Sequence, residues 1–292
     1  MKKYLVTGGA GFIGSNIVKK LIETGNDVII LDNLSTGNVN NIPDGHELIK
    51  SYGKLPEEEL DGIFHLGMPS SSPLYKKDRY LVNQVVSDYI KLLEYATDRG
   101  LKIVYATTSS LYGNKPTPWK EDMIVGVNDY YTEARYYVER LSNLYFKLKE
   151  TKSIGLRLFS VYGAGEEYKK KYANLITQMV WSKRDNKEFV IYGDGKQRRD
   201  LTYVGDVVEA FILAMNSDIK CSVINIGTEA NYSLNELAEM IKVEVKYIDN
   251  PISNYVYNTR ANIFRARKIL DFKPQTVLVE GLEKITRYYN DK

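Results

Sequence analysis

The feature that most constrains the fold of this chain is a glycine-rich segment, VTGGAGFIGSNIV, at residues 6–18. It follows a strand-like run at 3–7 and opens a run with helical spacing at 12–25. Glycines at such a junction let the backbone turn tightly and approach a pyrophosphate, whose charge lies at the helix N-terminus. Two glycine spacings fit: Gly9-x-Gly11-x-x-Gly14 and Gly8-x-x-Gly11-x-x-Gly14. The segment therefore predicts a βαβ unit that binds a dinucleotide.

An acidic residue follows at the end of the next apolar run. Residues 27–32 are nearly all apolar and predict a buried strand, and Asp32 ends it, 18 residues after Gly14. A carboxylate at this place accepts hydrogen bonds from the adenosine ribose hydroxyls and repels a 2′-phosphate. Residues 32–41 contain no Lys or Arg that could receive that phosphate. The sequence therefore favours NAD over NADP.

Strand-like and helix-like runs alternate through the first half of the chain. This alternation predicts parallel crossovers and a doubly wound parallel sheet of the Rossmann type, an α/β fold. The further predicted strands are 62–67, 102–108 and 153–159, and the long predicted helices are 79–100 and 130–150.

The pattern loosens after residue 163, where short mixed elements precede a last helix near 277–290. We therefore expect a NAD-binding domain at 1–163 and a smaller mixed α/β lobe for the substrate at 164–292. Segments at about 189–230 are expected to return to the first domain.

Composition limits the function classes. The 292 residues include 40 basic and 37 acidic residues, and this near balance argues against a dedicated nucleic-acid binder. The single cysteine, Cys221, excludes an internal disulfide and fits a reducing compartment, so a cytoplasmic location is expected. Apolar runs stay shorter than the ~18 residues of a membrane helix. With only His46 and His65, a histidine-rich metal site is not expected.

Several segments in order carry a resemblance to a known family. The chain resembles the extended short-chain dehydrogenase/reductase family, and within it the UDP-sugar 4-epimerases, from about residue 3 to residue 290. The segments are the glycine-rich segment, DNLSTG (32–37), FHLG (64–67), YATTSSLYG (105–113), Tyr131-x-x-x-Arg135, LRLFSVYG (156–163) and IYGDGKQRRD (191–200). These motifs are specific in combination and modest singly.

The resemblance implies a mechanism and its catalytic residues. Hydride leaves C4 of the sugar for NAD while a tyrosinate, here Tyr131, takes the hydroxyl proton. The 4-keto sugar then turns over and receives hydride on its other face. Thr108 would hold the C4 oxygen. Ser109 and Ser110 stand where the related 4,6-dehydratases carry Asp-Glu, so a dehydratase is disfavoured.

Arg135 departs from the family, which places a lysine four residues after the tyrosine. A free tyrosine has a pKa near 10 and is a poor base at neutral pH. A cation one helical turn away on the same face favours the ionised phenol. Arg135 keeps that charge at every accessible pH, but its guanidinium is planar and bulkier than an ammonium. We expect Tyr131 to act as the base, with slower turnover than in relatives with lysine.

The resemblance also implies contact residues for both ligands. Besides Tyr131 and Arg135, the cofactor would contact Gly8, Gly11, Phe12, Ile13, Gly14, Asp32, Asn33, Leu34, Ser35, Thr36, Gly37, Leu66, Gly67, Asn83, Ala106 and Phe159. Besides Thr108, the substrate would contact Ser109, Ser160, Asn174, Leu175 and Arg199.

Two segments depart from the family pattern. The first concerns the contact with the adenine of the cofactor, and the second weakens a UDP-specific interpretation in favour of another nucleotide or a lipid-linked or free sugar. The usual Gly-Asp pair at the adenine is replaced by Ser51-Tyr52, and an Arg-Pro-Gly-Asp segment by DNPISNYVYNTRAN (249–262). A sugar oxidoreductase such as a 4-keto-sugar reductase, and a catalytically impaired NAD-binding sensor, remain alternatives to a 4-epimerase. The long helices at about 79–99 and 129–150 would pair across a two-fold axis in a homodimer, as in the family.

Overall fold

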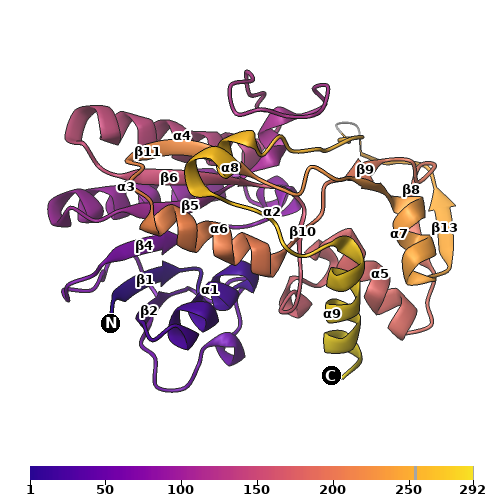
Figure 1. The fold of residues 1–292 in the computed structure, drawn as a ribbon, viewed down its shortest axis with the longest axis horizontal. Helices are drawn as coiled ribbons and strands as arrows, with labels where there is room; N and C mark the ends of the chain where they lie inside the picture. Colours follow the sequence, from indigo (N-terminus) through magenta and orange to yellow (C-terminus); the bar gives the residue numbers. More distant parts are fainter. Residues whose placement is uncertain (253–254, 292) are drawn as a thin grey trace.

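The buried apolar runs of the first half of the chain form one parallel sheet (Figure 1). The computed structural model describes residues 1–252 and 255–291, and within them this sheet has seven strands. In spatial order these are β11 (Cys221–Ile226), β6 (Ser153–Leu158), β5 (Ile103–Thr108), β4 (Gly62–His65), β1 (Lys3–Thr7), β2 (Asp27–Leu31) and β3 (Leu48–Ile49). All neighbouring pairs are parallel, which confirms the predicted Rossmann-type fold.

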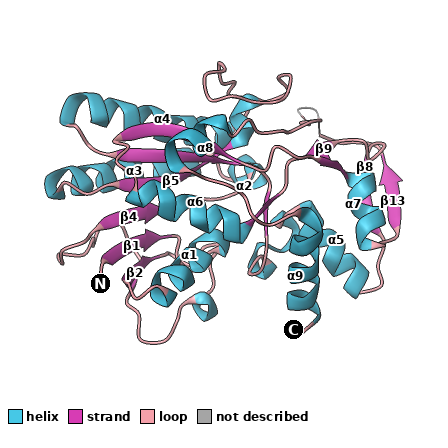
Figure 2. Ribbon diagram, viewed as in Figure 1, coloured by secondary structure: helices cyan, strands magenta, loops and turns pink. Residues whose placement is uncertain are grey.

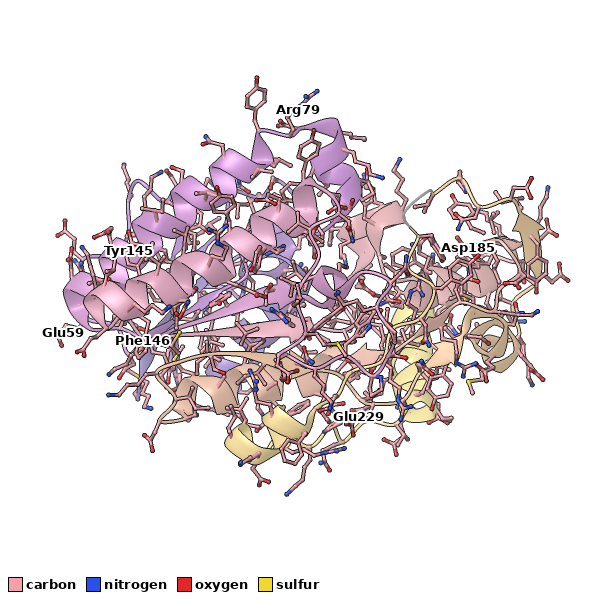
Figure 3. The ribbon with its side chains drawn as sticks, turned by 90° about the horizontal axis from the view of Figure 1, so that it is seen from above. Glu59, Arg79, Tyr145, Phe146, Asp185 and Glu229 are labelled. Carbon is pink, nitrogen blue, oxygen red and sulfur yellow. The ribbon has the colours of Figure 1, made fainter. Side chains whose placement is uncertain are left out.

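Helices cover both faces of this sheet (Figure 2). One face packs against α3 (Leu81–Arg99) and α4 (Tyr130–Lys149), whose apolar residues join those of β4 and β5 in a continuous core. The other face packs against α1 (Phe12–Glu23), α6 (Val204–Asn216) and α8 (Phe264–Leu270). Seen from above, α3 and α4 run side by side along the outside of the molecule (Figure 3).

Local sequence signals determine where the two long helices end. Helix α3 stops at Gly100, which adopts φ +64°, a conformation that glycine takes without a Cβ penalty. Helix α4 starts after Asp129, whose carboxylate accepts the backbone N–H of Thr132 at 2.8 Å, while the Thr132 hydroxyl accepts the Asp129 N–H at 3.1 Å. This reciprocal cap satisfies two N–H groups and starts the helix next to Tyr131.

The second half of the chain contributes the predicted smaller mixed lobe, which has a core of its own. Its helices are α5 (Leu175–Arg184), α7 (Leu234–Ile241) and α9 (Leu278–Asn290). Its strands pair in twos: β8 (Phe189–Tyr192) with β13 (Val245–Ile248), and β9 (Arg198–Arg199) with β12 (Tyr232–Ser233).

Several short elements complete the fold. They are α2 (Ser72–Lys77), the paired strands β7 (Val161–Tyr162) and β10 (Thr202–Tyr203), and the 3₁₀ turns at Val39–Asn41, Ser109–Tyr112 and Glu167–Tyr172. Within 189–230, β8 belongs to the lobe, whereas α6 and β11 pack on the large sheet. The division of the chain at residues 163 and 164 stays a prediction. In the described part of the chain, the helices lack the length and apolar character needed to cross a membrane.

Candidate active site

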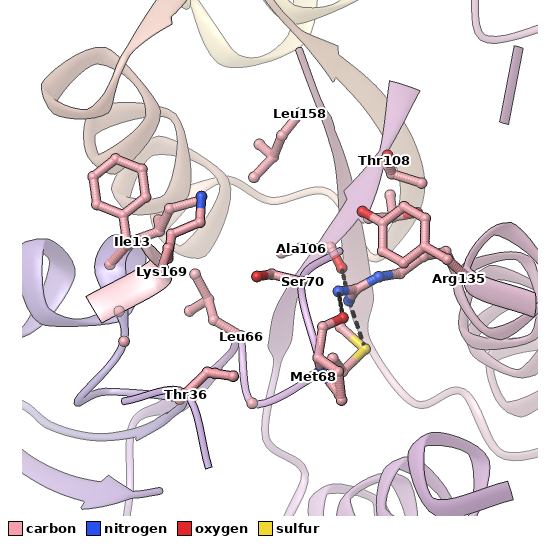
Figure 4. Close-up of a pocket in the computed structure, with 18 of the residues that line it drawn as sticks. Ile13, Thr36, Leu66, Met68, Ser70, Ala106, Thr108, Arg135, Leu158 and Lys169 are labelled. Atoms are coloured by element: carbon pink, nitrogen blue, oxygen red, sulfur yellow. Dashed lines mark hydrogen bonds between the residues drawn. The ribbon is translucent and has the colours of Figure 1, made fainter. Parts of the chain in front are cut away.

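A cavity of about 440 Å³ lies where the carboxyl ends of the central strands face the smaller lobe (Figure 4). The chain leaves β1 for β2 on one side, whereas β4 adds on the other, so this is the switch point where ligands bind in open α/β sheets. The predicted contact residues that line the cavity are Gly8, Gly11, Phe12, Ile13, Gly14, Asp32, Asn33, Ser35, Thr36, Leu66, Gly67, Ala106, Thr108, Ser109, Tyr131, Arg135, Ser160 and Asn174.

The glycine-rich turn between β1 and α1 is packed too tightly for side chains. Gly8 has φ +69°, and a Cβ there would lie 2.6 Å from the backbone carbon of Leu66 at the end of β4. A Cβ on Gly14 would lie 2.0 Å from the Gly8 carbonyl oxygen. The first N–H groups of α1 have no partner within the helix and begin at this turn. The turn therefore presents backbone donors to the cavity, as a pyrophosphate site requires.

Asp32 lies at the end of β2 with its carboxylate fixed by the backbone. Its oxygens accept the N–H of Ala10 at 3.0 Å and of Leu34 at 2.8 Å, and burial raises the pKa of the carboxyl. Leu34 (φ +59°) and Gly37, whose α-carbon faces the carboxylate, shape this turn and do not line the cavity. The carboxylate that is predicted to bind the adenosine ribose is thus held in place by two backbone N–H groups.

Thr108 and Tyr131 reach the cavity from two neighbouring elements. Thr108 ends β5, and its hydroxyl oxygen accepts the N–H of Ser110 at 3.1 Å, which leaves its own proton free to donate. Tyr131 lies in the first turn of α4, with its ring edge-to-face with Tyr75 at 5.7 Å. A hydroxyl donor and a phenol therefore line one cavity together with the glycine turn.

Arg135 lies one turn along α4, and only 5% of it is exposed. Its Nη1 donates to the Met68 Sδ atom at 2.9 Å and more weakly to the Ala106 carbonyl at 3.4 Å, while Nη2 donates to the Pro69 carbonyl at 2.9 Å (Figure 4). The guanidinium carbon is 5.2 Å from the centre of the Tyr131 ring.

The charge of Arg135 is buried without an acidic partner. Among the described residues no carboxylate lies within ion-pair distance of it, and its buried Nε has no hydrogen-bond partner. Burial and then the charge of Arg135 lower the pKa of the neighbouring His65 to about 3, so the imidazole is neutral. An unpaired buried cation is costly, and such groups gather at functional sites. The guanidinium thus supplies positive charge beside the phenol of Tyr131.

A buried ion pair and its hydrogen bonds connect α4, β5 and β6 next to the cavity. Glu139, one turn beyond Arg135 on α4, accepts from Nε and Nη2 of Arg157 on β6 at 3.0 and 2.7 Å. Glu139 also accepts from the Thr107 hydroxyl at 2.8 Å, and Arg157 donates to Tyr112 at 2.8 Å. Since Thr107 precedes Thr108, this network ties α4 to the strand that carries the predicted hydroxyl donor.

On the lobe side the predicted residues come together less completely. Asn174 lines the cavity, but its side chain caps α5 and donates to the Val161 carbonyl at 3.0 Å. Leu175 follows it and does not line the cavity. Arg199 also does not, because its guanidinium stacks on Tyr255 at 5.2 Å and donates to backbone carbonyls of the small lobe.

Two more predicted cofactor contacts lie away from the cavity. Phe159 is fully buried in the core against Trp119, at 5.8 Å between ring centres, because β6 turns its side chain to the α6 face. Asn83 is exposed on the outer face of α3, and Gln84 and Asp88 line the cavity instead. The rotation of α3 about its axis decides whether Asn83 or Gln84 lines the cavity, and a residue-by-residue resemblance does not determine that rotation.

Sequence reasoning missed several cavity residues. Tyr52, which replaces a residue of the family's Gly-Asp pair, lines the cavity. Its hydroxyl donates to the Gly67 carbonyl at 3.3 Å. Lys169 lies in the charged run EEYKKKY, which alone does not show which lysine turns inward. The others that the sequence left out of the contact set are Leu31, Met68, Pro69, Ser70, Leu81, Gln84, Asp88, Thr107, Ser110, Leu158, Val161 and Tyr172.

The residues present fit a bound NAD. The glycine turn would hold its pyrophosphate, and Asp32 its adenosine ribose, with no cation nearby in 32–41 for a 2′-phosphate. Within the ranges that the structure describes, no group of three or more His, Cys, Asp and Glu side chains could hold a metal ion.

Comparison with known proteins agrees with this geometry. Residues 4–227 match the model of the NAD dependent epimerase/dehydratase family. The chain is 34% identical to a putative UDP-glucose 4-epimerase of Methanocaldococcus jannaschii, with 97% of each chain covered. It is 28% identical to UDP-glucuronic acid decarboxylase 1 of Danio rerio, covering 99% of this chain and 73% of the relative.

Among solved structures, the UDP-glucose 4-epimerase of Thermotoga maritima with UDP-glucose superposes with a TM-score of 0.91, at 28% identity and 99% coverage of both chains. These similarities confirm the resemblance to UDP-sugar epimerases of the extended short-chain dehydrogenase/reductase type. The glycine turn, the buried carboxylate after β2 and the tyrosine line one cavity, and residues 4–227 match the family model, so this chain belongs to the NAD-dependent epimerase/dehydratase family.

Proposed function

We propose that this chain is an NAD-dependent nucleotide-sugar 4-epimerase of the UDP-glucose/UDP-galactose type. The observation that carries the proposal is the meeting of Thr108, Tyr131 and the buried charge of Arg135 in the cavity of the glycine turn. The relatives named above include epimerases of this type, which supports the same reaction class.

In this proposal each catalytic side chain has one task. The bound cofactor supplies reversible hydride transfer at C4. The phenolate of Tyr131 takes the proton of the C4 hydroxyl and later returns it, and the Thr108 hydroxyl donates to the C4 oxygen. Arg135 stabilises the negative phenolate and keeps a free Nε–H, while Met68 and Pro69 hold its guanidinium.

Decarboxylation of a nucleotide-linked uronic acid is a second candidate, because UDP-glucuronic acid decarboxylases are among the similar proteins. Both reactions begin with oxidation at C4, and loss of CO₂ additionally requires a carboxylate at C6 of the sugar. Ser109 and Ser110 leave the end of β5 without an acid, and the described acidic residues lining the cavity are Asp32 and Asp88. This arrangement favours epimerisation, which needs only a group that moves one proton.

Turnover of purified protein without added cofactor tests the proposal. UDP-galactose and UDP-glucose should interconvert, with products identified by mass spectrometry and NMR. Consumption of added NADH with reduction of a 4-keto-sugar nucleotide, and no interconversion of the two UDP-sugars, would indicate a 4-keto-sugar reductase. CO₂ release from UDP-glucuronate would indicate a decarboxylase. Binding of NAD with no reaction on any sugar nucleotide would indicate a sensor and contradict the proposal.

We also propose that the enzyme is a homodimer that pairs through α3 and α4. The outer face of these helices exposes Ile90, Tyr137, Leu144 and Leu148, and a shallow hollow of about 350 Å³ lies along α4. A second copy would cover these apolar side chains. Light scattering should give twice the monomer mass for the native protein and the monomer mass for Leu144→Lys; a monomeric native protein would contradict this.

A further inference from the structure

The cavity contains few positive charges for the ligands it is built to hold. Its described lining includes two cations, Arg135 and Lys169, and two acids, Asp32 and Asp88. The two terminal nitrogens of the Arg135 guanidinium already donate to Met68, Pro69 and Ala106. The pyrophosphate of a dinucleotide carries a negative charge on each phosphate. Among the described residues that line the cavity, Lys169 is the remaining cation that could pair with this charge.

Lys169 faces the start of α1 from the opposite side of the cavity. Its Nζ lies 5.1 Å from the centre of the Phe12 ring, the first residue of α1 after the glycine turn. Figure 4 shows its side chain beside Ile13, the second residue of the helix. The first backbone N–H groups of α1 and the lysine ammonium therefore border the same end of the cavity.

Glu166 holds this lysine in place. Its carboxylate is fully buried and lies 2.8 Å from Lys169 Nζ. It also accepts the backbone N–H of Asn174 at 3.0 Å and the hydroxyl of Thr177. The carboxylate is therefore largely satisfied by fixed donors, while the ammonium, with three protons, retains donors for another partner. The lysine side chain is 21% exposed, so it is restrained and still open to a ligand.

We propose that Lys169 binds the pyrophosphate of the NAD cofactor, opposite the backbone donors of the glycine turn. The turn supplies neutral N–H groups, and Lys169 supplies the charge that they lack. This inference concerns cofactor binding and stands whether the sugar reaction is epimerisation or decarboxylation. The alternative role for Lys169 is solely to neutralise the buried charge of Glu166.

Calorimetric titration of nucleotide-stripped protein with NAD tests the proposal. Lys169→Met should bind NAD about ten- to a hundredfold more weakly, because a hydrogen bond to a charged group is lost. Lys169→Arg should retain most of the affinity. The matched control is Lys170→Met, since Lys170 is exposed, is next in sequence and does not line the cavity. Equal NAD affinity of Lys169→Met and Lys170→Met would overturn the proposal.

A double variant separates ligand binding from charge neutralisation. Lys169→Met combined with Glu166→Gln removes both charges, so no buried carboxylate is left without a cation. If Lys169 contacts the pyrophosphate, the double variant should bind NAD as weakly as Lys169→Met. Recovery of native NAD affinity in the double variant would show a purely structural lysine and overturn the proposal.

Titration with UDP distinguishes the two sources of a diphosphate. The contact proposed here is to the cofactor, so Lys169→Met should weaken NAD binding more than UDP binding. Loss of UDP affinity with unchanged NAD affinity would place the lysine on the sugar nucleotide and overturn the assignment to the cofactor.

Discussion

The two sides of the cavity differ in how closely they match what the sequence predicts. The sheet side consists of the strand ends of β1, β2, β4 and β5 with the first turns of α1 and α4, and most predicted residues there line the cavity. The lobe side consists of residues 158–175 together with Arg199, and there Phe159, Leu175 and Arg199 lie outside the lining. Regular elements with short turns determine the first side, whereas irregular segments determine the second.

The difference has a physical origin. On the sheet side, the carboxyl ends of the parallel strands lie along one edge of the sheet. Residues at these strand ends are therefore close to the cavity. On the lobe side, Arg199 and Tyr255 come from segments that meet only through tertiary packing. Position in a motif predicts location well in the first case and poorly in the second.

The largest expected effect tests the sheet side at Tyr131, the proposed base. Tyr131→Phe should lower kcat by about 10²- to 10⁴-fold, because the proton acceptor is lost. NAD affinity should remain native, since the ring and its contact with Tyr75 persist. Tyr130→Phe, at an adjacent and exposed position, is the control. Native turnover of Tyr131→Phe in a coupled assay would remove the tyrosine from the mechanism.

The buried ion pair between Glu139 and Arg157 should contribute strongly to the stability of the sheet side. Glu139→Gln leaves Arg157 buried without a counter-charge and should lower the free energy of unfolding by about 3–5 kcal/mol. Lys149→Met breaks an exposed pair with Glu94 and should cost about 0–1 kcal/mol. Urea unfolding measures both, and equal losses would contradict the role given to the buried network.

Arg135 should matter through its charge more than through its shape. The guanidinium carbon lies 5.2 Å from the centre of the Tyr131 ring, so its positive charge favours negative charge on the phenol. Arg135→Met should therefore lower turnover by up to about two orders of magnitude. Arg135→Lys should stay closer to native. An equal loss of turnover in Arg135→Lys and Arg135→Met would argue against a role for the charge.

The glycine turn should tolerate no added methyl group at its tightest point. The Cβ of Gly14→Ala would lie 2.0 Å from a carbonyl oxygen, so α1 must shift, at a cost of about 1–3 kcal/mol in stability. NAD affinity should fall as well, because the N–H groups move with the helix. Gly126→Ala meets nothing closer than 3.9 Å and should be neutral. Thermal unfolding and NAD titration decide between these outcomes.

The smallest expected effect lies on the lobe side. Arg199 is turned away from the cavity, so Arg199→Met should change UDP affinity by no more than about two- to threefold. Calorimetry with UDP measures this. A tenfold or greater loss of UDP affinity would show that Arg199 moves onto the ligand when UDP binds. The lobe side would then match the sequence prediction more closely.

Much of the fold could be predicted because the signals are local. Asp129 and Gly100 mark the ends of long helices, and the apolar runs at 27–32 and 103–108 predict buried parallel strands. Helical phase was harder: Asn83 was expected at the cavity, yet Gln84 faces it, because the packing of α3 on the sheet sets its rotation. Within residues 158–174, Ser160 and Asn174 line the cavity as predicted, whereas Lys169 and Tyr172 were missed, since no periodic pattern orients a loop.

The sequence by itself determined the αβ alternation, the glycine turn, the carboxylate after β2 and the pairing of Tyr131 with a cation one helical turn away. These follow from residue type and spacing along single elements, so they need no knowledge of distant contacts. Only the tertiary structure decided that the guanidinium of Arg135 is held by Met68 and Pro69, and that Lys169 is the lysine that turns inward. Those outcomes depend on segments far apart in the chain, whose approach is set by packing and by the need to satisfy buried charge.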